Sequence, residues 1–281
     1  MNKNGIILVL SILSICICTG FARAEKVLIV SFLDIGQGDA IYIEAPNSNQ
    51  MIIDGGPGHN LSHALSDVMP YGDRSINVLM VTNPDTDHYA GFLDVLKEYD
   101  IGAVIEPGTV SHSKTYEKLE QSIATENIPE LIARKGMTID LDREHGVRFT
   151  VLFPDRDVHT WSTNDGSIEG ILSYGKTKIF FTGDGTKKTE GIILSGNTPD
   201  VLRSDILKVP HHGSATSSGE SFVKTIAPKW AVISAGAGNT YGLPKQVTLD
   251  TLSRNAIDVI RTDREGTITF TSNGIQFVRV N

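Results

Sequence analysis

The sequence predicts a layered α/β fold in which two mixed β-sheets pack face to face and helices cover the outside. Two features of the chain support this prediction. A β-rich segment followed by strand-loop-helix segments occurs once in each half, and no linker or low-complexity stretch separates the halves. Sheets and helices with one apolar face bury those faces in such layers. The length of 281 residues is enough to bury a full two-sheet core.

The elements follow from the apolar periodicity of each segment, and the chain opens with a β-meander. Gly55, Gly56 and Gly58 end that meander. Strands are expected at 27–33, 40–44, 51–54, 77–82, 103–105, 131–133, 138–141, 147–153, 170–174, 178–182, 205–209, 229–234 and 259–262. Helices are expected at 59–69, 89–99, 114–126, 187–195, 220–226 and 247–255, with a polar loop at 83–88 and a closing hairpin at 266–280.

The first 24 residues have the pattern of a bacterial secretory signal peptide. Lys3 precedes an uncharged apolar run at 6–18, and Ala22-Arg23-Ala24 forms a small-x-small cleavage site. The run is shorter than the roughly 20 apolar residues of a membrane-spanning helix, although an uncleaved anchor is the alternative. We therefore expect a signal peptide at 1–24 and one domain at 25–281. The mature protein would be periplasmic or secreted, without stable membrane insertion.

Composition limits the chemistry and the partners of this domain. Both cysteines, Cys16 and Cys18, leave with the signal peptide, so no thiol remains as nucleophile or metal ligand. Loss of Lys3 and Arg23 reduces the 25 basic residues to 23 against 33 acidic ones, a net charge of −10. Nucleic acid is thus a candidate partner only through a local site, because bulk charge would repel it.

The main chemical signal is the polar loop after the expected strand at 77–82. Asp85, Asp87 and His88 place three metal-capable side chains within four positions. Strand ends are where α/β folds place their ligands, and Asp and His suit Zn²⁺ or Mn²⁺. The alternative is structural, with Asp87 capping the helix that follows.

Two further strand ends carry similar groups. Asp184 follows an apolar strand and stands between two glycines, a pattern that by itself is also typical of an ordinary turn. His211 and His212 follow the expected strand at 205–209. Three junctions of this kind together provide the three or four protein ligands that a catalytic metal site needs.

These motifs resemble the metallo-β-lactamase superfamily, and within it the hydrolase domain of the bacterial competence protein ComEC. The likeness extends from about 27 to 274 and includes the segments 34–39, 54–56, 83–91, 182–184, 209–214, 233–236 and 239–244. The resemblance implies an αββα metallo-β-lactamase sandwich with one or two ions of Zn²⁺ or Mn²⁺. The metal ligands that it implies are Asp85, Asp87, His88, Asp184 and His212, with His211 as the alternative to His212.

The sequence departs from the pattern of this family at the first metal site. Asn83 occupies the first motif position, where the family has His, and Leu243 replaces another His. The segment 164–167, where many relatives supply a further His, has none. The resemblance therefore implies an intact second site and a weakened first one.

The resemblance implies a metal-dependent, phosphodiesterase-like hydrolase that cleaves a small or oligomeric anionic substrate, including nucleic acid. Asp87 would orient the attacking water and accept its proton, and His211 would protonate the leaving oxygen. Asn83, Ser214 and Lys208 are expected to contact the substrate. The alternatives are a lactam, lactone or amide hydrolase, and a catalytically silent metal-binding relative.

Overall fold

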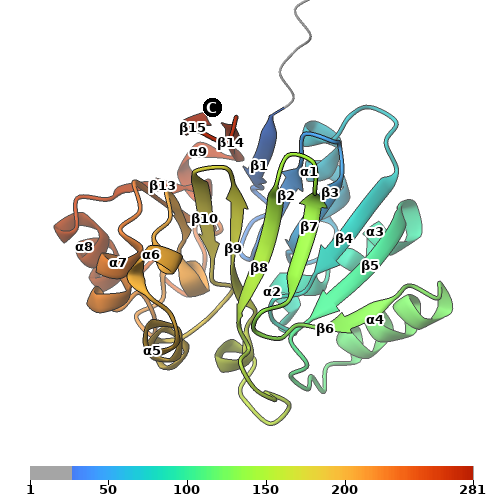
Figure 1. Ribbon diagram of the computed structural model, residues 1–281. Coiled ribbons are helices and arrows are strands. Elements are labelled where there is room, and N and C mark those ends of the chain that lie inside the picture. Colours follow the sequence, from blue (N-terminus) through green and yellow to red (C-terminus); the bar gives the residue numbers. More distant parts are fainter. Residues whose placement is uncertain (1–26, 281) are drawn as a thin grey trace, which may run out of the picture.

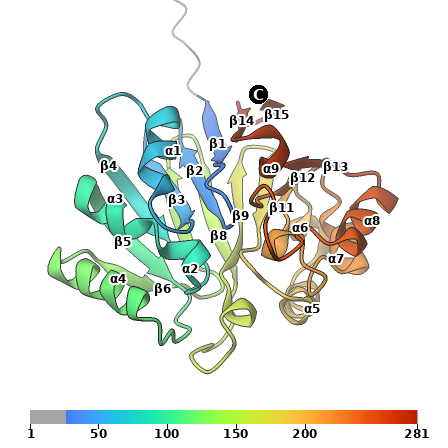
Figure 2. The same cartoon turned by 180° about the vertical axis from the view of Figure 1, so that it is seen from behind.

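The computed structural model describes residues 27–280, so the predicted signal peptide lies outside the described residues. Figure 1 shows two sheets layered one on the other in the middle, with α1, α3 and α4 on one flank and α5 to α8 on the other. The reverse view in Figure 2 shows the same layers. Within residues 27–280, no helix is both long enough and apolar enough to cross a membrane. The predicted two-sheet sandwich with outer helices is confirmed.

The first sheet has eight strands in the order β15-β14-β1-β2-β3-β4-β5-β6. Pairing is antiparallel from β15 to β3 and parallel from β3 to β6. Its strands are β1 (Leu28–Phe32), β2 (Ala40–Glu44), β3 (Gln50–Gly55), β4 (Ser75–Met80), β5 (Asp100–Glu106), β6 (Glu130–Ile132), β14 (Ile268–Ser272) and β15 (Phe277–Arg279). The parallel strands place their carboxyl ends at one edge of this sheet.

The second sheet has seven strands in the order β13-β12-β11-β10-β9-β8-β7. Here β10 to β13 are parallel and β7 to β10 antiparallel. Its strands are β7 (Thr138–Asp142), β8 (Val147–Phe153), β9 (Glu169–Tyr174), β10 (Thr177–Phe181), β11 (Ile206–Lys208), β12 (Trp230–Ile233) and β13 (Asp258–Arg261). Both sheets are therefore mixed.

Helices cover the outer faces of both sheets. On the first sheet these are α1 (Asn60–Val68), α2 (Thr86–Tyr89), α3 (Phe92–Glu98) and α4 (Lys114–Thr125). On the second they are α5 (Lys187–Gly196), α6 (Pro199–Leu202), α7 (Glu220–Ile226), α8 (Gln246–Arg254) and α9 (Thr262–Glu265). Short 3₁₀ turns lie at Asn164–Gly166 and Pro210–Gly213.

The central core lies between the sheets and is formed by the inward side chains of both. The ring of Phe32 on β1 stacks on Phe181 of β10 with centroids 6.2 Å apart, so the two sheets meet directly. Both side chains are fully buried, and burial of an apolar side chain of this size stabilises the fold by roughly 1.5–3 kcal/mol. Separate apolar layers lie under the helices.

One local prediction was wrong, at the loop after β4. The segment 83–88 was expected to be a loop and 89–99 one helix, but α2 begins at Thr86 and ends at Tyr89, and α3 begins at Phe92. The interruption falls at Gly91, where an added Cβ would clash with the carbonyl oxygen of Gly55. This close contact fixes α2 against the end of β3.

Candidate metal centre

The motif side chains come from the carboxyl ends of four strands. Asp54 lies on β3, His88 lies on α2 after β4, Asp184 follows β10, and His212 follows β11. Strands β3 and β4 are parallel neighbours in one sheet, and β10 and β11 are parallel neighbours in the other. The topology thus brings the four junctions to one end of the sandwich.

His88 is fully buried and is held by the carboxylate of Asp54. Its Nδ1 lies 2.9 Å from Asp54 Oδ2, and the same carboxylate accepts hydrogen bonds from Thr82 N at 2.7 Å and Thr82 Oγ1 at 2.6 Å. A carboxylate at Nδ1 keeps the proton on that nitrogen, so Nε2 is left as the metal-binding atom. That Nε2 lies 3.1 Å from Asp184 Oδ2.

Asp184 reaches the centre because glycine precedes it. Gly183 has a φ of 47°, and a Cβ there would lie 2.8 Å from Oγ1 of Thr82, which follows β4 of the opposite sheet. The Asp184 backbone N–H donates to Ser167 Oγ at 3.3 Å, which fixes the turn from the other side. Asp184 is 3 % exposed and faces both His88 and His212. The Gly-Asp-Gly segment therefore forms part of this cluster.

His212 is oriented by groups that contact its Nδ1. This nitrogen donates to the carbonyl oxygen of Ser234 at 3.0 Å and lies 3.4 Å from Asp39 Oδ1. Lys208 forms a buried ion pair with the other oxygen of Asp39 at 2.6 Å. Lys208, expected to contact the substrate, is 1 % exposed and lies on the side of His212 away from its Nε2.

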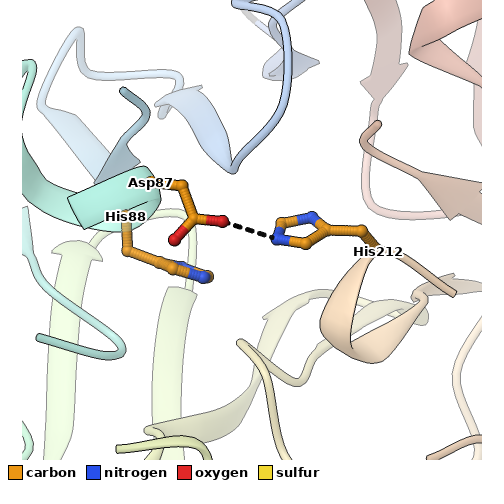
Figure 3. Close-up of side chains that lie close together, drawn as sticks. All are labelled: Asp87, His88 and His212. Atoms are coloured by element: carbon orange, nitrogen blue, oxygen red, sulfur yellow. Dashed lines mark ion pairs between the residues drawn. The ribbon is translucent and has the colours of Figure 1, made fainter. Parts of the chain in front are cut away.

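The free ring nitrogens and two carboxylates face one another. His212 Nε2 lies 3.3 Å from Asp87 Oδ2 and 3.7 Å from Asp184 Oδ1, and Figure 3 shows Asp87, His88 and His212 pointing together. His88 Nε2, His212 Nε2 and Asp184 Oδ1 are buried atoms without a hydrogen-bond partner in residues 27–280. Buried polar atoms normally have partners. Two imidazoles and two carboxylates are a donor set that suits Zn²⁺ or Mn²⁺, so the residues fit a divalent cation.

The charges of the cluster also fit a cation. The cluster and its supporting groups include the carboxylates of Asp39, Asp54, Asp87 and Asp184 and the ammonium of Lys208. With neutral imidazoles, these groups give a formal charge of −3. Burial favours a raised pKa for Asp184, but His88 and His212 outweigh burial and hold this pKa below its usual range. Burial favours a lowered pKa for His212, but Asp184 and Asp39 raise it to about 10. A bound divalent cation would replace the protons that otherwise balance these carboxylates.

The first two motif positions lie outside this donor set. Asn83 is buried, its Oδ1 accepts from Asp85 N at 2.9 Å, and its Nδ2 donates to Asn164 Oδ1 at 2.9 Å. Asp85 Oδ2 accepts from Thr163 Oγ1 at 2.8 Å. Among the described residues, no convergent group of potential metal ligands contains Asp85. Asp85 was expected as a metal ligand and Asn83 as a substrate contact. In the structure, both side chains form hydrogen bonds with neighbouring protein groups instead.

His211 lies at the open side of the cluster. Its side chain is 26 % exposed, its Nε2 lies 3.8 Å from Asp184 Oδ2, and its Nδ1 lies 3.2 Å from Thr216 Oγ1. Ser214, expected to contact the substrate, is half-buried. Its hydroxyl oxygen lies 3.0 Å from Thr216 Oγ1, the same atom that His211 contacts. His211 and His212 have φ values of 51° and 52°, and this left-handed turn gives the two rings different surroundings.

Asp39 and Asp54 were not predicted as site residues, although both lie in the segments that carry the family resemblance. Each is 1 % exposed and contacts Nδ1 of a cluster histidine. The sequence feature that could have identified both residues is an aspartate next to a glycine, at the end of an apolar segment. Gly38, with a φ of 139°, lets the Asp39 loop approach α2, because a Cβ there would clash with the carbonyl oxygen of Asp87.

The chain is similar in sequence to known bacterial proteins. The chain is 32 % identical over 259 residues to ComE operon protein 3 of Bacillus subtilis, covering 86 % of this chain and 32 % of that protein. It is 28 % identical over 229 residues to Recombination protein 2 of Haemophilus influenzae, covering 80 % of this chain and 26 % of that protein. The chain thus spans about a third or less of the length of these relatives.

Solved structures share the fold at low sequence identity. The metallo-β-lactamase fold protein YhfI from Bacillus subtilis matches with a TM-score of 0.56 at 10 % identity, over 88 % of this chain and 100 % of that one. The metallo hydrolase Igni18 from Ignicoccus hospitalis matches with a TM-score of 0.55 at 11 % identity, over 86 % and 98 %. The family model described as "Metallo-beta-lactamase superfamily" matches residues 33–237. The chain belongs to the metallo-β-lactamase superfamily.

Proposed function

We propose that this protein is an exported, metal-dependent hydrolase that cleaves phosphodiesters. The observation that carries the proposal is the convergence of His88 Nε2, His212 Nε2 and Asp184 Oδ1, which are buried and lack hydrogen-bond partners among the described residues. Folding alone does not require such an arrangement, because buried unsatisfied groups destabilise a protein. Together with Asp87, they would hold Zn²⁺ or Mn²⁺.

A bound divalent cation supplies Lewis-acid polarisation of the scissile bond and lowers the pKa of water that it binds from ~15.7 toward ~7. The protein itself supplies the positioning. Asp54 and the Ser234 carbonyl hold the two imidazoles so that each Nε2 points into the cluster. The site is therefore built before a ligand arrives, which avoids reorganisation during the reaction.

Two residues of the cluster remain accessible and suit proton transfer. The side chain of Asp87 is 35 % exposed, and His88 and His212 outweigh burial to lower its pKa, so the carboxylate is ionised and can accept a proton from water. His211 has a partly exposed ring beside Asp184 and can donate a proton to the leaving oxygen or contact a phosphoryl group.

A phosphodiester substrate is favoured by the kind of relatives that this chain has. Relatives carry the names ComE operon protein 3, Recombination protein 2 and Competence protein ComA, which refer to competence and recombination. We infer a substrate from nucleic acid or from another anionic phosphodiester of the cell envelope. Binding would be local, at the centre, because the net charge of the mature chain opposes association over the whole surface.

Export rests on the predicted signal peptide at 1–24, outside the described residues. The proposal places the mature protein in the periplasm or outside the cell. Fractionation of cells that produce the full chain tests this. Recovery of a shortened chain outside the cytoplasm is expected, whereas full-length protein in the cytoplasm would contradict it.

Hydrolysis is tested with purified protein that carries no His tag and has been stripped of metal. Aryl phosphodiesters, single-stranded oligonucleotides, lactones and β-lactams are offered with Mn²⁺ or Zn²⁺. We expect metal-dependent cleavage of the phosphodiesters, lost in Asp184→Asn and retained in the matched control Asp67→Asn, which changes an exposed aspartate. Cleavage of a lactam or lactone, without cleavage of any phosphodiester, would contradict the proposed substrate class. Metal binding without any activity would favour a catalytically silent relative, the alternative suggested by Asn83.

A further inference from the structure

We infer that this chain holds one divalent cation and that a hydrogen-bonded network closes the position of a second. The inference rests on the proposed metal-dependent function. The network consists of Asn83, Asp85, Thr163 and Asn164, and we call it the closing network. It joins the first two positions of the loop motif to the segment where a further metal ligand would be expected.

Asn83 cannot act as a ligand without losing its present bonds. Its only side-chain oxygen accepts from Asp85 N at 2.9 Å, and its amide donates to Asn164 Oδ1 at 2.9 Å. The residue is fully buried, so water cannot replace these bonds if the amide turns. An amide oxygen also suits Zn²⁺ less well than imidazole does. Any gain from a metal contact would be offset by two broken buried hydrogen bonds.

Asp85 is turned toward the protein in the same way. Its Oδ2 accepts from Thr163 Oγ1 at 2.8 Å, and its backbone N–H is used by Asn83. The carboxylates that face the Nε2 atoms of the two cluster histidines, Asp87 and Asp184, belong to the second site.

The segment that contributes Thr163 and Asn164 is anchored from two other directions. Gly166 packs so closely on Thr109 that a Cβ would lie 3.1 Å from Thr109 Oγ1. Asp165 accepts from Thr186 Oγ1 at 2.6 Å and from Lys188 Nζ at 3.1 Å. No histidine stands between 160 and 210, and the exposed His159 lines a different cavity of about 370 Å³. The turn therefore holds the closing network in place and offers no imidazole.

The first test counts ions in the purified wild-type protein. Metal is removed with chelator, Mn²⁺ or Zn²⁺ is titrated back, and native mass spectrometry and elemental analysis give the stoichiometry. One equivalent per chain is expected, and Co²⁺ in its place should give the electron paramagnetic resonance of an isolated ion. Two tightly bound ions would overturn the inference and leave the proposed function standing. No bound ion would overturn the proposed function as well.

The second test asks whether the second position stays empty because the closing network has no imidazole where a metal would need one. The double variant Asn83→His, Asn164→His replaces two members by imidazoles next to Asp85, and we expect it to bind two equivalents. The matched control Asn83→Ala, Asn164→Ala breaks the same bonds without adding ligands and should stay at one. Circular dichroism verifies that both fold. A second ion in the alanine control would show that the network alone excluded it while native ligands remained, which contradicts the account of the missing imidazoles.

Discussion

The buried ion pair between Lys208 and Asp39 makes a quantitative prediction for Lys208→Met. The two charged atoms lie 2.6 Å apart, and both side chains are about 1 % exposed. Methionine is unbranched and close to lysine in size, so the change removes the charge with little change in packing. Asp39 would then keep its negative charge in the interior, with only the imidazoles of His212 and His88 left to offset it.

The expected loss follows from the burial of that charge. Removing one partner of a buried pair destabilises a protein by about 3–5 kcal/mol, because the other charge remains without compensation. For a domain of this size, the same loss lowers Tm by roughly 6–20 °C. Lys224→Met is the matched control, because Lys224 is 63 % exposed and its pair with Glu220 belongs to the class worth about 0.3–0.5 kcal/mol.

Urea unfolding at pH 7, with chelator and again with saturating metal, measures both losses. The double variant Asp39→Asn, Lys208→Met should be more stable than the sum of the single losses predicts, because it leaves no buried charge unpaired. A loss below about 1 kcal/mol for Lys208→Met would place the pair in the range of surface pairs and refute the reasoning.

Three further predictions concern neighbours of the centre. Asp54→Asn should weaken metal binding roughly 10–100-fold in a chelator competition, because it removes the carboxylate that orients His88; unchanged affinity would exclude that role. Gly183→Ala should cost about 1–3 kcal/mol in urea unfolding, because alanine is strained at a φ of 47°; a neutral result would contradict it. Burial raises the pKa of Glu169 well above its usual range, so the folded state favours the protonated acid and loses stability as pH rises above about 4.3. Glu169→Gln should therefore stabilise the protein at pH 7 and have little effect near pH 3.5, and equal effects at both pH values would refute this.

The elements that the sequence predicted well are those whose pattern is local. The strand expected at 147–153 is β8 with the same limits, and the helix expected at 220–226 is α7. Apolar periodicity decides such segments. The pairing of β1 with β14 joins Leu28 to Ser272, and no local pattern contains that partner. Sheet order is set by packing across the whole chain.

The centre shows the same division between local and long-range information. The motifs identified Asp87, His88, Asp184 and His212 as candidates, and the structure brings their side chains together. The place of Lys208 could not be predicted, because a lysine at a strand end is usually solvated. Its partner Asp39 lies 169 positions away in the chain. The one available hint was the position of this lysine between the apolar residues Leu207 and Val209.

The central claim is that Asp87, His88, Asp184 and His212 hold the ion of a hydrolytic centre. The most direct test is crystallography of the metal-loaded protein, with anomalous difference maps recorded on both sides of the absorption edge of manganese or zinc. We predict a peak bounded by Nε2 of His88, Nε2 of His212 and the two carboxylates. A map without a peak between these atoms, or with the ion bound only elsewhere, would contradict the account.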